Sequence, residues 1–252
     1  MPKKPVRMHK LPAHMAALWE STLANRLKYE SDPEKFHFVG RHRLALDCWF
    51  LGCLALVGIG DGEPAAQDAF HAAGRYAGLA LTLPTPAYAP PGYIWAAHKF
   101  ENLLEICTAF GSRDAVVVAA GVPDERFRNP DIVGPPESFL IIQAFQAWLL
   151  GDDAQVTAWA AEILAAPSVY PSTAASASAL QALVRRDETT FRACLHDVVV
   201  TARGQVRYLS SPVEGVVCRT GIALCRMART IGIEVEDQIY LPTRLLPTES
   251  IR

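Results

Sequence analysis

The 252-residue sequence lacks the short motifs by which many enzymes and metal proteins can be identified. It has no Gly-x-Gly-x-x-Gly or Walker-type loop for binding phosphates, and no Gly-x-Ser-x-Gly elbow for a nucleophilic serine. None of its six cysteines forms a Cys-x-x-Cys pair, so neither a zinc site nor a dithiol redox motif is indicated. We therefore expect no enzyme, no metal and no cofactor. We interpret the cysteines as buried free thiols of a protein in the reducing cytoplasm.

A strong net charge and a membrane-spanning segment are also missing. The formal charge is -2, whereas non-specific binding to nucleic acid needs a large positive field. Two long uncharged stretches are unsuited to cross a bilayer, because residues 76–97 contain four prolines and residues 163–184 are mostly Ala, Ser and Pro. The basic start is not followed by the apolar core of a signal peptide. We expect a soluble cytoplasmic protein whose partner is neither nucleic acid nor a membrane.

Sustained period-two alternation is absent as well, so the sequence predicts an all-α fold. The segments with helical spacing of apolar residues, or with helix-favouring composition, are 11–29, 43–57, 63–83, 93–110, 114–120, 137–150, 152–165, 172–186, 187–202 and 213–231. We interpret the proline-rich residues 84–92 as a rigid connector. The polar loop 122–136 marks the predicted boundary between an N-terminal half, 1–121, and a C-terminal half, 137–252, which we expect to form one compact unit.

A loosely repeated block is the clearest feature that the sequence does contain. The segment QAWLLGDDAQV at 146–156 recurs 35 residues later as QALVRRDETTF at 181–191, with Gln, Ala, an apolar pair and an acidic pair at matching places. Each copy is interpreted as the end of one helix, a very short turn and the start of the next. A period of this length, built from helix pairs, predicts antiparallel pairs packed as a compact tetratricopeptide-like or α-solenoid-like domain.

The acidic pairs of the repeated turns have two interpretations. Carboxylates at the first turn of a helix cap free N–H groups and interact favourably with the helix dipole. Equivalent turns of a helix-pair array also line one edge, where acidic side chains could meet a basic partner. Together with the acidic tail residues, this predicted acidic rim consists of Asp152, Asp153, Asp187, Glu188, Glu234, Glu236 and Asp237.

One further set of side chains invites a chemical interpretation. His98, Glu101 and Glu105 fall on one face of the helix predicted at 93–110, as metal ligands in a helical bundle can. The complementary Glu-x-x-His motifs that a di-iron site requires on other helices are missing. The polar face of an amphipathic helix accounts for the same three residues.

The last long helix is predicted to be amphipathic. Arg219, Arg226 and Arg229 share one face of it, and apolar side chains share another. Gly232 follows as a predicted C-terminal cap.

Two segments together resemble a known family. One is RLALDCWFLG at 43–52, followed by an Ala-rich helix through GRYA at 74–77, and the other is ARTIGIEV at 228–235, followed by YLPTRLLP at 240–247. Their order, with a Gln-Ala helix and a short acidic turn between them, resembles the immunity protein 49 family of bacterial polymorphic toxin systems, over about residues 40–247. The resemblance implies an all-α, non-enzymatic protein that binds a cognate toxin. It implies no catalytic residues.

Three functional hypotheses follow. The first is an immunity protein that binds and neutralises a toxin or effector by occluding its active site. The second is a tetratricopeptide-like adaptor, or an effector chaperone, that binds peptide segments in a groove. The third is an enzyme in which His98, Glu101 and Glu105 hold a metal ion, and the missing motifs disfavour it.

Overall fold

The computed structural model describes residues 12–31, 38–59, 62–82, 97–124, 137–205 and 216–252. This part of the chain contains ten α-helices and a closing 3-10 helix, and it has no β-strand, which confirms the predicted all-α fold. The helices are α1 (Pro12–Ser31), α2 (Phe38–Leu56), α3 (Glu63–Thr82), α4 (Ala97–Phe110), α5 (Arg113–Ala120), α6 (Glu137–Leu150), α7 (Asp153–Ala165), α8 (Pro171–Arg185), α9 (Glu188–Gln205) and α10 (Arg219–Thr230), followed by η5 (Thr243–Leu245).

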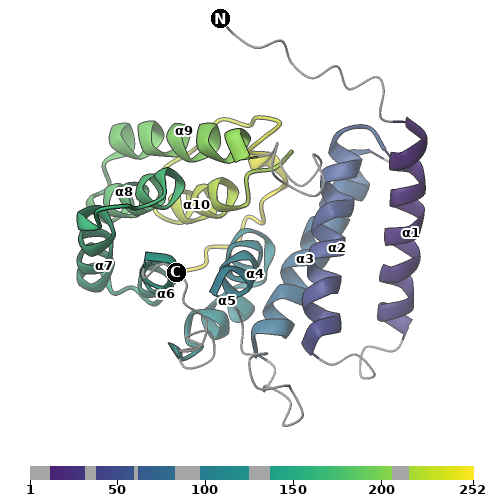
Figure 1. The fold of residues 1–252 in the computed structure, drawn as a ribbon, viewed down its shortest axis with the longest axis horizontal. Helices are drawn as coiled ribbons and strands as arrows, with labels where there is room; N and C mark the ends of the chain where they lie inside the picture. Colours follow the sequence, from purple (N-terminus) through teal and green to yellow (C-terminus); the bar gives the residue numbers. More distant parts are fainter. Residues whose placement is uncertain (1–11, 32–37, 60–61, 83–96, 125–136, 206–215) are drawn as a thin grey trace, which may run out of the picture.

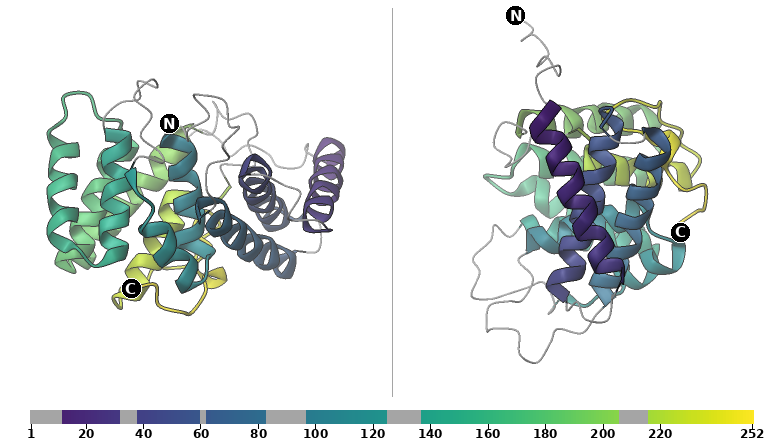
Figure 2. Two further views of the ribbon diagram at one scale, coloured as in Figure 1. Left: turned by 90° about the horizontal axis from the view of Figure 1, so that it is seen from below. Right: turned by 90° about the vertical axis from the view of Figure 1, so that its right-hand side faces the viewer.

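The first three helices stand side by side at one end of the molecule, with α1 outermost (Figures 1 and 2). Glycine residues allow these helices to pack closely against their neighbours. A Cβ on Gly52 would lie 2.6 Å from the ring of Phe70, and one on Gly74 would lie 2.2 Å from the carbonyl carbon of Phe110. At Gly74 the backbone of α3 can therefore lie directly against the backbone at the end of α4.

The remaining helices form a second group in which chain neighbours pack antiparallel. In this group α6 packs on α7, α7 on α8, and α8 on α9, while α10 packs against α4 (Figure 1). Helices from the two predicted halves thus touch each other through α4, α5, α6 and α10. The proposed boundary at 122–136 and the connector at 84–92 fall almost entirely outside the described residues, so the division into halves stays a prediction.

Aromatic side chains fill the core where the two groups of helices meet. The ring centroids of Trp49 and Phe70 are 5.1 Å apart, and those of Phe70 and Phe110 are 4.9 Å apart in a stacked arrangement. All six cysteines are free thiols; five are buried and Cys194 is partly buried. The interpretation of the cysteines as small core hydrophobes is confirmed for those five.

The repeated block has the same geometry in both copies. Gly151 and Arg186 occupy matching positions after α6 and α8, and both have positive φ, 83° and 54°. The next residue donates its backbone N–H to the carbonyl five residues earlier, from Asp152 to Ala147 and from Asp187 to Ala182, each at 2.9 Å. This is the Schellman arrangement, which satisfies carbonyls at the end of a helix.

The acidic residue of each turn then begins the next helix. Asp152 accepts a hydrogen bond from the backbone N–H of Gln155 at 3.0 Å, and Asp187 accepts one from Thr190 at 3.0 Å. Both side chains are therefore N-caps, as the sequence predicts. Gly232 also has positive φ, 84°, and ends α10 with the same pair of backbone hydrogen bonds, which confirms its predicted capping role.

Two expectations for individual helices were wrong. The helix α2 starts at Phe38 and not at residue 43, where its start was predicted. The helix α10 starts only at Arg219, because Cys218 has an extended backbone and donates its N–H to the carbonyl of Tyr240.

Arg226 does not lie on a solvated polar face of α10, as the sequence suggested, but is buried with 1 % exposure. Its guanidinium donates to the carbonyls of Thr108, Ala109 and Gly111, at 3.2, 3.3 and 2.6 Å. These carbonyls are at the end of α4, where a helix leaves its last acceptors without internal partners. Burial lowers the pKa of Arg226 to about 10, which still leaves the side chain charged at neutral pH.

Candidate partner-binding site

The predicted acidic rim is built from three chain turns that share one edge. Asp153 at the start of α7, Arg186 at the α8–α9 turn, and Thr230 at the end of α10 line one pocket together with Arg252. Across the same edge, Arg192 of α9 donates to the backbone carbonyl of Glu234. The two acidic turns and the start of the tail therefore lie together.

Most carboxylates of this edge interact with groups in the same chain. Arg252 pairs with Asp153 at 2.7 Å, and Arg192 pairs with Glu188 at 2.7 Å. Hydrogen bonds from the side chain and the backbone of Thr190 lower the pKa of Asp187, so this carboxylate stays ionised. Glu234 forms a 3.8 Å ion pair with Arg229, and Asp237 forms an ion pair with Arg244 and accepts a hydrogen bond from its backbone N–H at 2.9 Å.

The last two residues of the predicted rim are Glu236 and Asp237. Asp237 is connected through Arg244 to Glu63 at the start of α3, with 3.0 Å between the Arg244 and Glu63 side chains. Glu236 is exposed. A role of the seven residues in binding a partner stays a prediction.

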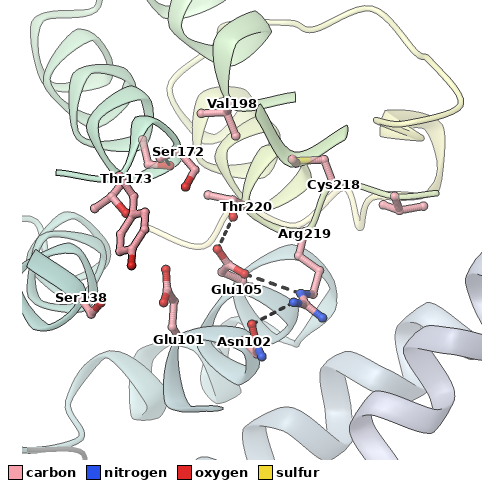
Figure 3. A pocket seen from close by; sticks show the side chains of 14 residues that line it. Glu101, Asn102, Glu105, Ser138, Ser172, Thr173, Val198, Cys218, Arg219 and Thr220 are labelled. Atoms are coloured by element: carbon pink, nitrogen blue, oxygen red, sulfur yellow. Dashed lines mark hydrogen bonds and ion pairs between the residues drawn. The ribbon is translucent and has the colours of Figure 1, made fainter. Parts of the chain in front are cut away.

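A polar cleft lies at the opposite end of α8, α9 and α10, and sequence reasoning did not identify it (Figure 3). Its volume is about 360 Å³, within the range typical of ligand pockets. Its floor is α4, which contributes two glutamates, and hydroxyl groups surround it. The lining side chains used below are Glu101, Asn102 and Glu105 of α4, Ser138 of α6, Tyr170, Ser172, Thr173 and Ser176 at the start of α8, and Cys218, Arg219 and Thr220 at the start of α10.

Glu105 is the anchored carboxylate of the cleft. It is 5 % exposed, lies 3.8 Å from the Arg219 Nε, and accepts a hydrogen bond from the Thr220 hydroxyl. Arg219 also donates to the Oδ1 of Asn102 at 3.0 Å. Burial raises the pKa of Glu105, and the attraction to Arg219 and the hydrogen bond from Thr220 oppose this rise.

Glu101 is one helical turn before Glu105, and its carboxylate points into the cleft (Figure 3). No hydrogen bond or ion pair joins it to any residue that the structure describes. Burial, and then the charge of Glu105, raise the pKa of Glu101 to about 8, while Arg219 opposes the rise. The ionised form of Glu101 is therefore unfavourable in the unbound cleft, and a ligand with a hydrogen-bond donor or a positive charge would stabilise it.

These findings correct the interpretation of the helix predicted at 93–110. Glu101 and Glu105 do share a face, but this face lines an interior cleft and is not a solvated surface. The side chain of His98 lies outside the described residues. Among the described side chains, no group of three or more His, Cys, Asp and Glu residues could hold a metal ion.

The cleft can bind, but its described residues offer no activated nucleophile. Burial raises the pKa of the Cys218 thiol to about 12, so that thiol is neutral at physiological pH. The available groups are hydroxyls, the Glu105 carboxylate with its partner Arg219, the amide of Asn102, and the Glu101 carboxylate, which has no partner among the described residues. Such a lining is suited to a ligand that carries several hydrogen-bond donors and a positive charge.

Sequence reasoning missed the cleft because its parts come from five helices. The only local signal was the Glu101–Glu105 pair at i and i+4. The hydroxyl residues at the start of α8 belong to a weakly apolar stretch of the sequence that carries no local signal of a cleft.

Comparisons with known proteins identify the family. The family model for Immunity protein 49 matches residues 95–245, which is more than half of the chain. The match spans α4 to η5 and includes the cleft, whereas α1 to α3 and the resembling block at 43–77 precede it. The curated proteins and the solved structures contain no match. No described helix is both long and apolar enough to cross a bilayer. The chain belongs to the immunity protein 49 family, whose members are non-enzymatic inhibitors of toxins.

Proposed function

We propose that this protein neutralises its cognate toxin by binding it directly and covering the toxin's active site. The family match over residues 95–245 carries the proposal. An inhibitor that performs no chemistry has to act through contact, and complementary surfaces give such contacts specificity. The free thiols of the chain suit the reducing cytoplasm as the place of this encounter.

A co-expression experiment tests the direct interaction. The chain is produced together with the product of the adjacent gene in cells that the toxin alone arrests. We expect restored growth and a complex that survives size-exclusion chromatography. Continued arrest, with no complex formed by any product of a neighbouring gene, would refute the proposal.

The acidic rim is one surface that we propose for this contact. Its test needs variants that separate charge from capping, because Asp152 and Asp187 do both. Asparagine caps a helix about as well as aspartate but carries no charge. The double variant Asp152→Asn/Asp187→Asn should therefore keep its melting temperature but associate with the toxin more slowly, with a weaker dependence on salt.

The matched control is Asp152→Ala, which removes both the cap and the charge and is expected to lose about 1 kcal/mol of stability. If the double asparagine variant associates at the rate of the unmodified protein, the two aspartates are caps and nothing more.

A second candidate is the tetratricopeptide-like adaptor or effector chaperone. The packing of α6 on α7, α7 on α8 and α8 on α9 favours it, because two successive helix pairs in chain order are the unit of such arrays. An adaptor binds a short peptide in its groove, whereas an inhibitor of the proposed kind needs the folded toxin domain. Binding of isolated toxin peptides as tightly as the intact domain would favour the adaptor.

A further inference from the structure

The cleft above α4 contains more carboxyl groups than cations to pair with them. Two carboxylates, Glu101 and Glu105, share a single guanidinium, that of Arg219, and Glu105 is the nearer of the two to it. Glu101 has no bonding partner among the described residues, although it lies in the lining of an open cavity. Leaving a partly buried carboxylate without a donor is unfavourable, and proteins usually avoid it unless a ligand completes the site.

The surrounding groups add acceptors and few competing charges. Ser138 comes from α6, and Ser172, Thr173 and Ser176 come from the first turns of α8 (Figure 3). Each hydroxyl oxygen can accept hydrogen bonds from a ligand. The side chain of Tyr170 stands at the rim and is 57 % exposed, so it can pack on a group that enters from outside.

We infer that the cleft receives an arginine side chain of the toxin, whose guanidinium pairs with the carboxylate of Glu101. The inference rests on the proposed function, because it assigns the cleft as the point at which the bound toxin is recognised. A guanidinium is planar and has five donors in a fixed fork, so one carboxylate and several hydroxyl oxygens satisfy it better than they satisfy a compact ammonium. Tyrosine beside the entrance offers a ring face for the same cation.

This recognition has a characteristic pH dependence. Glu101 is largely protonated at neutral pH in the unbound protein, because its pKa is raised to about 8. Pairing with a guanidinium requires the ionised form, so binding expels a proton below pH 8. The affinity should therefore rise with pH between 6 and 8, by up to about tenfold per pH unit.

Other titratable and charged groups face Glu101 across the cleft. The titratable groups that line the cleft are Glu105 of α4, Tyr170 before α8, and Cys218 and Arg219 at the start of α10. Burial raises the pKa of Cys218 to about 12, far above this range. The lining residues from α6 and α9, which are Ser138, Val198 and Ala202, do not titrate. Besides burial, the charge of Glu105 raises the pKa of Glu101, and the Glu101→Gln variant described next shows which of the two carboxyl groups releases the proton.

The test compares Glu101→Gln with Glu162→Gln in the full chain, measured against the cognate toxin. Glu162 is an exposed glutamate of α7, so its replacement is the matched control. We expect Glu101→Gln to bind the toxin about 10- to 100-fold more weakly, mainly through faster dissociation, and to lose the rise in affinity between pH 6 and 8. Glu162→Gln should bind as the unmodified protein does.

A melting curve separates this role from a purely structural one. Because Glu101 has no partner among the described residues, Glu101→Gln should melt at the same temperature or higher, whereas loss of a structural residue would lower it. A double-mutant cycle then identifies the arginine: one toxin Arg→Ala substitution should weaken binding in the unmodified protein but have little further effect in Glu101→Gln.

The possible results are distinguishable. If the unmodified chain forms no complex with the toxin, the proposed function fails and the inference fails with it. If the complex forms but Glu101→Gln leaves its affinity and pH dependence unchanged, only the inference fails. Tight binding of free L-arginine to the cleft without competition against the toxin would also overturn it, because the cleft would then be a small-molecule site.

Discussion

Substitutions at the matched positions of the two repeated turns are predicted to change the stability of the protein in opposite directions. Gly151 and Arg186 both have a left-handed backbone, but only one of them is glycine. An L-residue with a side chain loses about 1–2 kcal/mol in this conformation. Glycine avoids this cost, but it also gives the unfolded chain more freedom, which reduces the gain in stability by about 0.4–1 kcal/mol. Arg186→Gly should therefore stabilise the protein by about 0.5–1 kcal/mol, and Gly151→Ala should destabilise it by a similar amount.

The surroundings of both residues simplify the interpretation. A Cβ on Gly151 would lie 3.6 Å from the Arg252 Nε, which is ordinary contact distance, so the effect of alanine comes from the backbone alone. Arg186 is exposed, and its side chain has no hydrogen bond to any described residue, so its removal sacrifices little.

Thermal unfolding measures both changes. For a chain of this size, 1 kcal/mol shifts the melting temperature by about 2–4 °C, so the two variants should move it by about 1–4 °C in opposite directions. Arg185→Gly is the control, since Arg185 is the last helical residue of α8 and a glycine there should destabilise by up to about 1 kcal/mol. The reasoning is refuted if Arg186→Gly lowers the melting temperature as Arg185→Gly does.

Three further predictions concern buried groups. Arg226→Met should lower the free energy of unfolding in urea by about 2–4 kcal/mol, because it leaves the carbonyls of Thr108 and Gly111 without their charged donor. A loss below 1 kcal/mol would mean that water replaces the guanidinium. The raised pKa of Glu101 should make stability fall as pH rises, since the protonated form stabilises the folded state below pH 4.5 and that contribution is lost through about pH 8. Unfolding in urea from pH 5 to 9 should show the decline, and Glu101→Gln should reduce it. Titration of the native protein with a thiol reagent at pH 8 should modify Cys194 first, because burial raises the pKa of Cys48 and Cys107 to about 12, and all six thiols should react at once in denaturant.

Local sequence signals predicted the helices well, and the repeated turns best of all. The start and end of α6 agree with the prediction to the residue, because an acidic residue at the first turn and a glycine after the last turn mark it on both sides. The second copy has Arg186 at the glycine position, and the acidic pair that follows still indicated the turn. The error at α10 arose because the apolar residues 216–218 continue the helical pattern although their backbone does not.

The site could not be predicted in the same way, because its contacts join distant parts of the chain. The spacing of Glu101 and Glu105 placed them on one face, but nothing local showed that α8 and α10 cover that face. The burial of Arg226 could not be predicted for the same reason. Arginine at helical spacing is usually solvated, and the carbonyls that bind Arg226 are at the end of α4, more than a hundred residues earlier.

That distance also has a consequence for the order of events during synthesis. The carbonyl of Thr108 and its donor Arg226 are 118 residues apart in the chain. At the usual speed of translation, a ribosome needs on the order of 10 s to cover such a length. During this interval the helices made first can pair locally, as α2 with α3. The carbonyls at the end of α4 still lack the Arg226 guanidinium that they bind in the folded protein. The cleft itself is complete only when α10 has docked, since Arg219 and Thr220 come from its first turn. If the cleft binds the toxin as we propose, each chain can do so only once its synthesis has reached α10.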